Sequence, residues 1–423
     1  MNRNEAENIL NRGFTHFVKD PLWQSVAMTK EIKDLLEERD VQKLARIRQN
    51  GPSYHIYPGA VHTRLSHSIG VYHLGREILL SLSRKSDELP FTEKGIMSFL
   101  VACLLHDIGH FPYAHSLKEL AIRDHEEIAA DMILNHPSLN AAVIAAGAVP
   151  ETVAAVIDKD QLTGDEETIL YRSILSGTLD PDKLDYLSRD AYFSGLTYGR
   201  QDTDFIISSL ALSDGRLALE REALASVEQI LFSKYMMYRS LYWHKGVRAA
   251  TCMIKKALTC ALLDGSIKYD DLYYLDDNEF NTMCLNRIDR TPALILVDMV
   301  EHNELLERKA VKEYTQGGAI EERAKKMDER ELMERRIHRY LKRIYPTLSE
   351  YEVIIDIPEP INFESHIPVV DRNGECTEIT DDDMVFTGEV SRMFQKKLRK
   401  VALYLPSYVD SSDAEEALRR EEK

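Results

Sequence analysis

Four residues in three short segments carry the side chains that a divalent metal needs. His67 lies in HTRLSH, His106 and Asp107 are adjacent in LLHDIGH, and Asp182 lies in LDPDKLDY. Two imidazole nitrogens and two carboxylate oxygens suit a divalent ion such as Mn, Fe, Mg, Zn, Co or Ni. The segments are far apart in the chain, so a metal site forms only if the fold brings them together.

These segments are ambiguous when each is taken alone. A His-Asp pair is common by chance, and here it comes just before Gly109, where it would also fit an ordinary polar helix end. In the acidic segment Asp180, Asp182 and Asp185 are all candidates, and their spacing does not choose between them. The combination of the segments is what predicts a metal site.

Cationic and aromatic side chains accompany the candidate ligands. Arg64 precedes His67 by three residues, so on a helix both side chains would lie on one face. The other such residues in these stretches are His110, His115, His125, Lys183, Tyr186 and Arg189. A metal beside cations is the arrangement that a polyphosphate substrate requires.

Plainer roles also fit some of these residues. Arg64 would serve equally well as a surface residue, and we predict that Arg189 pairs with the adjacent Asp190 in a salt bridge. His125 precedes two glutamates and also fits a structural imidazolium. We assign no function to the remaining nearby histidines, His62, His73 and His136.

Composition indicates a folded, acidic protein. Of 423 residues 44% are hydrophobic, and the net charge of -17 argues against general binding of nucleic acid or of an anionic membrane. None of the five cysteines forms a CxxC motif, which favours reduced thiols. The longest apolar run, IMSFLVACLL, is shorter than the roughly 20 residues of a membrane span, and the N-terminus lacks the apolar core of a signal peptide. We therefore expect a cytoplasmic protein.

The hydrophobic pattern predicts a mostly α-helical fold with a smaller C-terminal α+β appendage. We divide the chain into an N-terminal lead-in segment that packs on the core (1–60), a helical core that holds the candidate site (61–265), and an α+β region with a charged helix and an acidic tail (266–423). Expected helices cover residues 29–48, 92–106, 115–134, 151–157, 221–263 (with a break at Gly246), 320–343 and 390–399. Expected strands cover residues 54–57, 353–355, 368–370 and 401–405, with a hairpin at 214–215 and a mobile tail from Asp410.

Longer motifs extend the pattern of His, His-Asp and Asp. They are PGAVHTRLSHSIGVYHLG, LLHDIGHFPYAHSL, HEE, LDPDKLDYLSRDAYFSGL and YRSLYWHKGVRAA. Over about residues 15–262 the chain resembles the deoxynucleoside triphosphate triphosphohydrolases of the HD superfamily of metal-dependent phosphohydrolases. That branch includes the animal enzyme with a SAM domain and its bacterial relatives. The resemblance implies a helical HD-domain core and hydrolysis of a dNTP to deoxynucleoside and tripolyphosphate.

The resemblance also implies a role for each matching residue. His67, His106, Asp107 and Asp182 would bind the metal, and His110, His115 and His125 would form the catalytic histidine set. Gln49 would contact the sugar 3′-hydroxyl, and Tyr186 and Tyr242 would pack on the sugar. Arg64 and Lys183, together with His115, would face the phosphates, and Lys234 would lie where the animal enzyme has an Arg at the nucleotide.

Several positions depart from the family's pattern. Asn50 replaces a Leu that helps to exclude a 2′-hydroxyl, and Lys118 replaces an Asp beside the catalytic histidine, a place that Glu119 or Glu126 would have to fill. In the activating nucleotide site, Lys19 and Ala45 replace an Asn and an Arg. These changes leave the choice of sugar, the proton relay and the need for an activator open.

Other functions are compatible with the same ligands. One alternative is another HD phosphohydrolase, such as a nucleoside 5′-monophosphatase; an alarmone hydrolase would carry a Glu-Asp pair after the His-Asp pair, and this chain lacks it. Another alternative is a catalytically silent nucleotide-binding regulator. The resemblance implies a nucleoside triphosphate as substrate, a nucleotide activator, and a homo-oligomer built as a dimer of dimers, a homotetramer.

Overall fold

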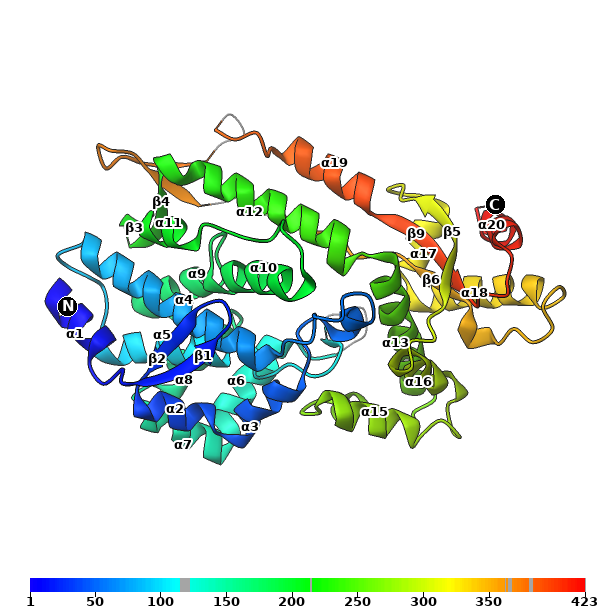
Figure 1. The fold of residues 1–423 in the computed structure, drawn as a ribbon, viewed down its shortest axis with the longest axis horizontal. Coiled ribbons are helices and arrows are strands. Elements are labelled where there is room, and N and C mark those ends of the chain that lie inside the picture. Colours follow the sequence, from blue (N-terminus) through cyan, green and yellow to red (C-terminus); the bar gives the residue numbers. More distant parts are fainter. Residues whose placement is uncertain (115–121, 214, 362, 364–366, 380–382, 423) are drawn as a thin grey trace.

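The computed structural model describes residues 1–114, 122–213, 215–361, 363, 367–379 and 383–422. Within these residues the chain is mostly helical, with small sheets, as predicted (Figure 1). No single helix in the described part is long and apolar enough to cross a membrane. Two helices bent by 103° to one another, Pro137–Ala145 and Pro150–Ile157, meet that test only as a pair.

The N-terminal two thirds of the chain forms a helical body. Its helices are α1 (Arg3–Asn11), α2 (Lys30–Leu36), α3 (Arg39–Gln42), α4 (Arg64–Lys85), α5 (Glu93–Leu105), α6 (His125–Asn135), α7 (Pro137–Ala145), α8 (Pro150–Ile157), α9 (Glu166–Leu175), α10 (Pro181–Ser194), α11 (Thr203–Ser208), α12 (Leu224–Met237) and α13 (Lys245–Leu263). Between α3 and α4 lie two 3-10 turns, η1 (Lys43–Arg46) and η2 (Gly51–His55).

The rest of the chain adds further helices and most of the strands. The helices are α14 (Tyr269–Leu272), α15 (Asp277–Leu285), α16 (Ile295–Glu301), α17 (Ala319–Ala324), α18 (Met327–Leu341), α19 (Gly388–Leu398) and α20 (Ser411–Arg420). The strands of the whole chain are β1 (His16–Asp20), β2 (Gln24–Met28), β3 (Leu210–Ser213), β4 (Arg216–Glu220), β5 (Glu307–Glu313), β6 (Ile354–Asp356), β7 (Pro368–Val370), β8 (Cys376–Glu378) and β9 (Lys400–Leu405).

Three sheets join segments that are distant in sequence. β1 and β2 form an antiparallel hairpin, which lies across α4 in Figure 1. The predicted hairpin of β3 and β4 is extended by β7 and β8, with β4 and β7 parallel. β5, β9 and β6 form an antiparallel sheet that packs with α18 and α20 over a separate, smaller apolar cluster. The C-terminal region is thus tied to the helical body through a shared sheet, and the division into three regions stays a prediction.

Three helices position the candidate site, and local sequence explains where each begins. The hydroxyls of Thr63 and Thr92 accept hydrogen bonds in the first turns of α4 and α5, and the Asp180 carboxylate does so in α10. Pro181 occupies the first turn of α10, where its missing N–H costs nothing. α4 packs against both α5 and α10, so the start of α4, the end of α5 and the start of α10 meet.

Some predicted elements are wrong. Residues 54–57 form no strand, because the carbonyl of Asn50 accepts the Ser53 N–H in the 3-10 turn η2. The tail from Asp410, predicted to be a mobile segment, forms the helix α20, and Glu421 after it accepts hydrogen bonds from Arg323 and Arg336. The break predicted at Gly246 within the segment 221–263 is confirmed, because α13 begins at Lys245, where the His244 side chain accepts the Gly246 N–H. The charged segment 320–343 is two helices, α17 and α18.

Candidate active site

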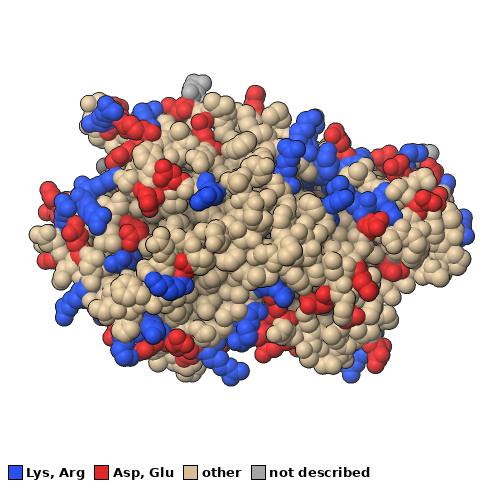
Figure 2. All heavy atoms as spheres, viewed as in Figure 1, with Lys and Arg blue, Asp and Glu red and all other residues tan. Residues whose placement is uncertain are grey.

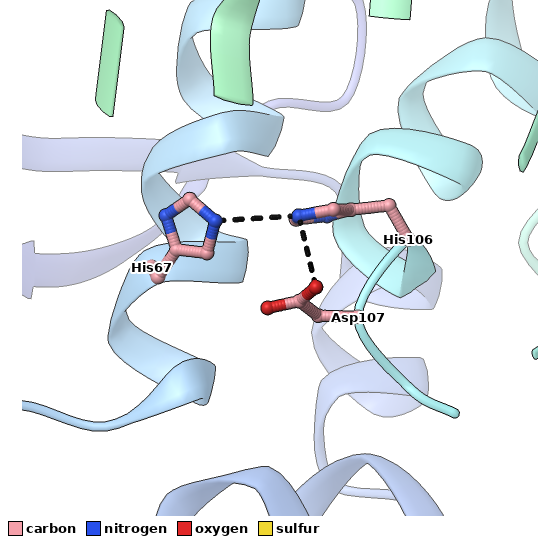
Figure 3. A group of neighbouring side chains, drawn as sticks. All are labelled: His67, His106 and Asp107. Atoms are coloured by element: carbon pink, nitrogen blue, oxygen red, sulfur yellow. Dashed lines mark hydrogen bonds and ion pairs between the residues drawn. The ribbon is translucent and has the colours of Figure 1, made fainter. Parts of the chain in front are cut away.

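The four predicted metal ligands converge where α4, α5 and α10 meet, and Figure 3 shows three of them, His67, His106 and Asp107. His67 Nε2 lies 3.3 Å from His106 Nε2 and 3.0 Å from Asp182 Oδ1. His106 Nε2 lies 3.5 Å from Asp107 Oδ1 and 3.9 Å from Asp182 Oδ1. Ligand atoms that bind one ion at about 2.0–2.2 Å are themselves roughly 3–3.5 Å apart. The spacing fits a single divalent metal, and His67, His106 and Asp107 form a group that could hold one.

Hydrogen bonds behind the two histidines orient them for metal binding. His67 Nδ1 lies 2.7 Å from Asp185 Oδ2, and His106 Nδ1 lies 2.9 Å from the Cys103 carbonyl oxygen. Both partners are acceptors, so with a metal bound each ring would keep its proton on Nδ1 and present the lone pair of Nε2 to the ion. Such outer partners are typical of metal-binding histidines.

The carboxylates of the candidate site favour a bound positive charge. Burial opposes protonation of His67, yet hydrogen bonds with Asp182 and Asp185 raise its pKa to about 10. Burial likewise opposes ionisation of Asp185, but Arg189 and His67 hold its pKa well below the usual range. The raised pKa of His67 reflects the negative charge of these carboxylates, and a bound cation would replace the proton and neutralise the same charge. The residues therefore fit a metal, whose identity stays open.

The structure separates the roles of the three acidic candidates in α10. Asp182 reaches the metal-binding group, whereas Asp185 supports His67 from behind. Asp180 caps α10 and pairs with Lys183. Asp180, Asp182 and Asp185, two and three residues apart, would thus serve as cap, ligand and support.

The predicted salt bridge between Arg189 and Asp190 is wrong. Arg189 donates to Asp185 and to Asp20, and Asp190 instead accepts from Tyr242 and lies 2.8 Å from His62 Nε2. Adjacent residues on a helix point about 100° apart and do not face one another, whereas residues four apart do. Asp185 and Arg189 have the spacing that allows the pair.

A cavity of about 480 Å³ opens onto the metal-binding group. Among the residues with predicted roles, its lining contains Gln49, Arg64, His67, His106, Asp107, His110, His125, Asp182, Tyr186 and Tyr242. His115, with Lys118 and Glu119, lies outside the described residues. The volume of the cavity is in the range of small-molecule sites. Side chains from both halves of the chain line the cavity, including Arg248, Lys255 and Asp277.

Lys183 and Lys234 are not among the described residues that line the cavity. The Lys183 ammonium donates to Asp180 and, at 2.8 Å, to the Gly177 carbonyl oxygen. Lys234 lies over the ring of Phe363, 5.8 Å from its centre. These nearby partners explain the positions of both side chains, so the roles that the resemblance implied for the two lysines stay predictions.

Arg64 lies beside the ligands, on the α4 face that it shares with His67. It is buried, and its Nη1 donates to Asp107 Oδ2 at 2.6 Å. Its Nε is also buried and has no hydrogen-bond acceptor among the described residues. A guanidinium N–H of this kind is a ready donor to an anion such as a phosphate.

His110 and His125 form a pair next to Asp107. Their ring centres are 3.9 Å apart, and His110 Nδ1 lies 3.1 Å from Asp107 Oδ1. Burial, with Arg64 nearby, lowers the pKa of His110 well below its usual value. Glu126 also lines the cavity, and burial raises its pKa. His110 is therefore held in its neutral form, whereas Glu126 at the cavity keeps its proton more tightly than an exposed glutamate does.

Sequence reasoning named Asp185 only as a candidate ligand and missed other supporting residues of this site. Asp185 could have been found as the support of His67, because it lies one turn after Asp182 on the same helix. Asp190, with its partners His62 and Tyr242, and Trp23, which contacts Asp185, carried no such signal. Asp190 is 128 residues from His62 and 52 from Tyr242, and Asp185 is 162 residues from Trp23.

Lys43, on η1, supports the loop after His106 and Asp107. Its buried ammonium donates to the carbonyl oxygens of His110 at 3.1 Å and Ile108 at 3.4 Å. Burial lowers its pKa to about 8. The unfolded chain then binds the proton more tightly, so folded-state stability should rise as the pH increases from about 8 towards 10.

We expect this rise to disappear in Lys43→Met. The melting temperature of the natural protein should gain on that of the variant between about pH 8 and 10, because only the natural protein relieves a buried charge. Thermal unfolding across this pH range measures the difference, with Lys94→Met on the exposed start of α5 as control. Parallel pH profiles for the natural protein and Lys43→Met would contradict the expectation.

Fold and site together define a helical protein with a His/Asp metal centre. An HD domain matches residues 64–189, which include all four ligands, and an HD associated region matches residues 201–416, about half of the chain. The chain belongs to the HD-domain family, in the branch that includes SAMHD1, and the resemblance seen in its sequence is confirmed.

Individual relatives agree with this placement. An uncharacterized protein of Bacillus subtilis, YwfO, is 33% identical over 57% of this chain and 54% of its own length. The deoxynucleoside triphosphate triphosphohydrolase SAMHD1 of Bos taurus is 24% identical over 60% of this chain and 47% of its own length. The chain thus spans about half the length of the curated relatives that it matches. A crystal structure of a phosphohydrolase from Bacteroides thetaiotaomicron has the same fold, with a TM-score of 0.71 and 23% identity over 92% of this chain and 99% of that one.

Proposed function

We propose that this protein is a metal-dependent phosphohydrolase that converts deoxynucleoside triphosphates to deoxynucleosides and tripolyphosphate. The observation that carries the proposal is the approach of His67 Nε2 and His106 Nε2, 3.3 Å apart, to carboxylate oxygens of Asp107 and Asp182 that lie 3.0–3.9 Å from these nitrogens, beside a buried arginine in a nucleotide-sized cavity. The SAMHD1 relatives, named for this reaction, supply the substrate class.

Each group at the site has a part in this reaction. A divalent cation held by His67, His106, Asp107 and Asp182 supplies Lewis-acid polarisation of phosphate and lowers the pKa of water. Arg64 neutralises charge on the phosphate through its unpartnered Nε. Water adds to the α-phosphorus while the bond from phosphorus to the 5′-oxygen breaks. The proton for that oxygen comes from His115, as the resemblance implies, or from His125 at the cavity, because the lowered pKa of His110 does not suit it as the acid.

Aromatic side chains suit the nucleoside. Tyr186 and Tyr242 line the cavity, as do Tyr238 and Trp243. Gln49 lines it too, and its buried Oε1 has no hydrogen-bond partner among the described residues. A sugar hydroxyl would satisfy this acceptor. Asn50 is also part of the lining, and its amide could bond to a 2′-hydroxyl, so ribonucleotides must be tested beside deoxyribonucleotides.

The test is a product assay on protein stripped of metal with a chelator. Mn, Fe, Mg, Zn, Co or Ni is added back with each dNTP and each NTP, singly and in pairs, and products are separated by anion exchange. We expect no turnover without metal, and deoxynucleoside with tripolyphosphate when it is restored. Faster turnover with a pair than with either nucleotide alone would support a nucleotide activator.

Other products would overturn the proposal. Orthophosphate or pyrophosphate from a triphosphate would contradict attack at the α-phosphorus. Hydrolysis of nucleoside monophosphates alone would identify a 5′-monophosphatase. Nucleotide binding without any product, under every metal, would identify a regulator. Size measurement with and without nucleotide tests the proposed dimer of dimers.

A further inference from the structure

The turn of the N-terminal hairpin touches the support of the metal centre. Residues 21–23 connect β1 to β2, and Asp20 Oδ1 accepts the N–H groups of Leu22 at 2.8 Å and Trp23 at 2.9 Å. This is the side-chain turn typical of aspartate, and it fixes where Trp23 points. The indole Nε1 of Trp23 donates to Asp185 Oδ1 at 2.6 Å.

Asp185 is the carboxylate that orients His67, and hydrogen bonds to both of its oxygens fix its own position. Its Oδ2 lies 2.7 Å from His67 Nδ1 and accepts from Arg189 Nε at 2.8 Å. Its Oδ1 accepts from Arg189 Nη2 at 2.8 Å and from Trp23. Asp185 and Arg189 are fully buried. Each carboxylate oxygen therefore has two donors, and one of the four donors, the Trp23 N–H, comes from the hairpin.

Two further features show that this packing is closely fitted. Arg189 also donates to Asp20 Oδ2 at 2.8 Å, so the same hairpin residue that shapes the turn holds the arginine. A Cβ at Gly70 would lie 1.9 Å from Asp185 Oδ1 and 2.5 Å from Arg189 Nη2, so only glycine fits there on α4. The hairpin, α4 and α10 thus meet on one buried carboxylate.

We propose that Trp23 is a positioning residue for the metal site: through Asp185 it holds His67 with Nε2 toward the other ligands. The N-terminal hairpin is then part of the metal centre, although it lies more than forty residues before the first ligand. This inference rests on the metal site of the proposed function and names a residue that tunes it. Loss of such outer partners lowers metal affinity by roughly 10–100-fold in other metal sites.

Trp23→Phe tests the proposal, because it keeps an aromatic ring on the hairpin and removes only the N–H donor. The full chain is stripped of metal, and its affinity for Mn²⁺ is measured by calorimetry and by competition with a chelator. We expect roughly 10-fold weaker binding, the lower end of the range for lost outer partners. Phe17→Leu on the exposed face of the same hairpin is the matched control, and its Mn²⁺ affinity should equal that of the natural protein.

A second measurement separates positioning from folding. Trp23 and Trp243 are the only tryptophans of the chain, so in a Trp243→Phe background the fluorescence reports on Trp23 alone. Its emission should change as Mn²⁺ saturates the site, and no change should follow in the same protein carrying His106→Ala and Asp107→Ala. The melting temperature of metal-free Trp23→Phe should stay near that of the natural protein.

The outcomes distinguish the inference from the function on which it rests. Three results would each overturn the positioning role alone. Trp23→Phe could bind Mn²⁺ as tightly as the natural protein does, Phe17→Leu could lose as much Mn²⁺ affinity as Trp23→Phe, or the emission of Trp23 could stay the same when metal binds. Failure of the natural protein to bind Mn²⁺, or any of the other metals tested, would overturn the metal site itself.

Discussion

Replacing His106 and Asp107 together by alanine is expected to abolish metal-dependent turnover, by at least roughly 10³-fold. The two residues supply one nitrogen and one oxygen of the four ligand atoms, and the remaining pair, His67 and Asp182, cannot hold a cation in a buried site on their own. The loss should exceed the about 10²–10³-fold cost of removing a single charge-stabilising donor. Product assays across the metal series and measurement of bound metal check both halves of this expectation.

The chain offers a matched control for that variant. His302 and Asp298 form a His-Asp pair at the exposed end of α16, with Nδ1 and Oδ1 3.3 Å apart. His302→Ala with Asp298→Ala removes the same two side-chain types from a place with no part in the site, and it should keep natural activity and metal content. Near-natural turnover in the His106 and Asp107 variant would show that the active site lies elsewhere.

The helical character of the fold was predictable because it depends on residues close together in the sequence. Thr63, Thr92 and Asp180 cap α4, α5 and α10, and the apolar spacing after each cap is regular. Element ends were harder to predict where a side chain from elsewhere decides them. The tail after Asp410 is acidic and reads as mobile, but two arginines of α17 and α18 fix Glu421.

The metal ligands were predictable for a related reason: their chemistry is carried by residue type. The roles of the charged residues near the ligands were not predictable, because each role depends on which partner lies nearest after folding. Lys183 lies one turn from Tyr186, yet Asp180 at the helix start binds it first. Trp23 and Asp185 are 162 residues apart and share no motif. Cavity residues of the C-terminal region, such as Asp277, likewise become visible only once both halves of the chain are folded together.

Arg64→Gln is expected to lower kcat/KM for the triphosphate by roughly 10²–10³-fold while metal affinity changes much less. Arg64 touches the site twice. Its Nη1 bonds to Asp107 Oδ2, and its buried Nε finds no acceptor within the described part of the protein. If the second donor serves the phosphate, the variant loses transition-state charge stabilisation yet keeps all four ligands. Steady-state kinetics with saturating Mn²⁺, beside Mn²⁺ titrations, separate these two effects.

Arg84→Gln, at the exposed far end of the same helix, is the control and should leave both quantities unchanged. Arg64→Lys adds a sharper comparison, because lysine keeps the charge but lacks the planar set of donors that bonds to Asp107 and to a phosphate at once. We therefore expect Arg64→Lys to lie between the natural protein and Arg64→Gln in kcat/KM. If Arg64→Gln instead loses metal affinity and activity by the same factor, Arg64 acts only through Asp107. The phosphate of the substrate must then be neutralised by other cations of the cavity, of which Arg248 and Lys255 on α13 would be the next to replace.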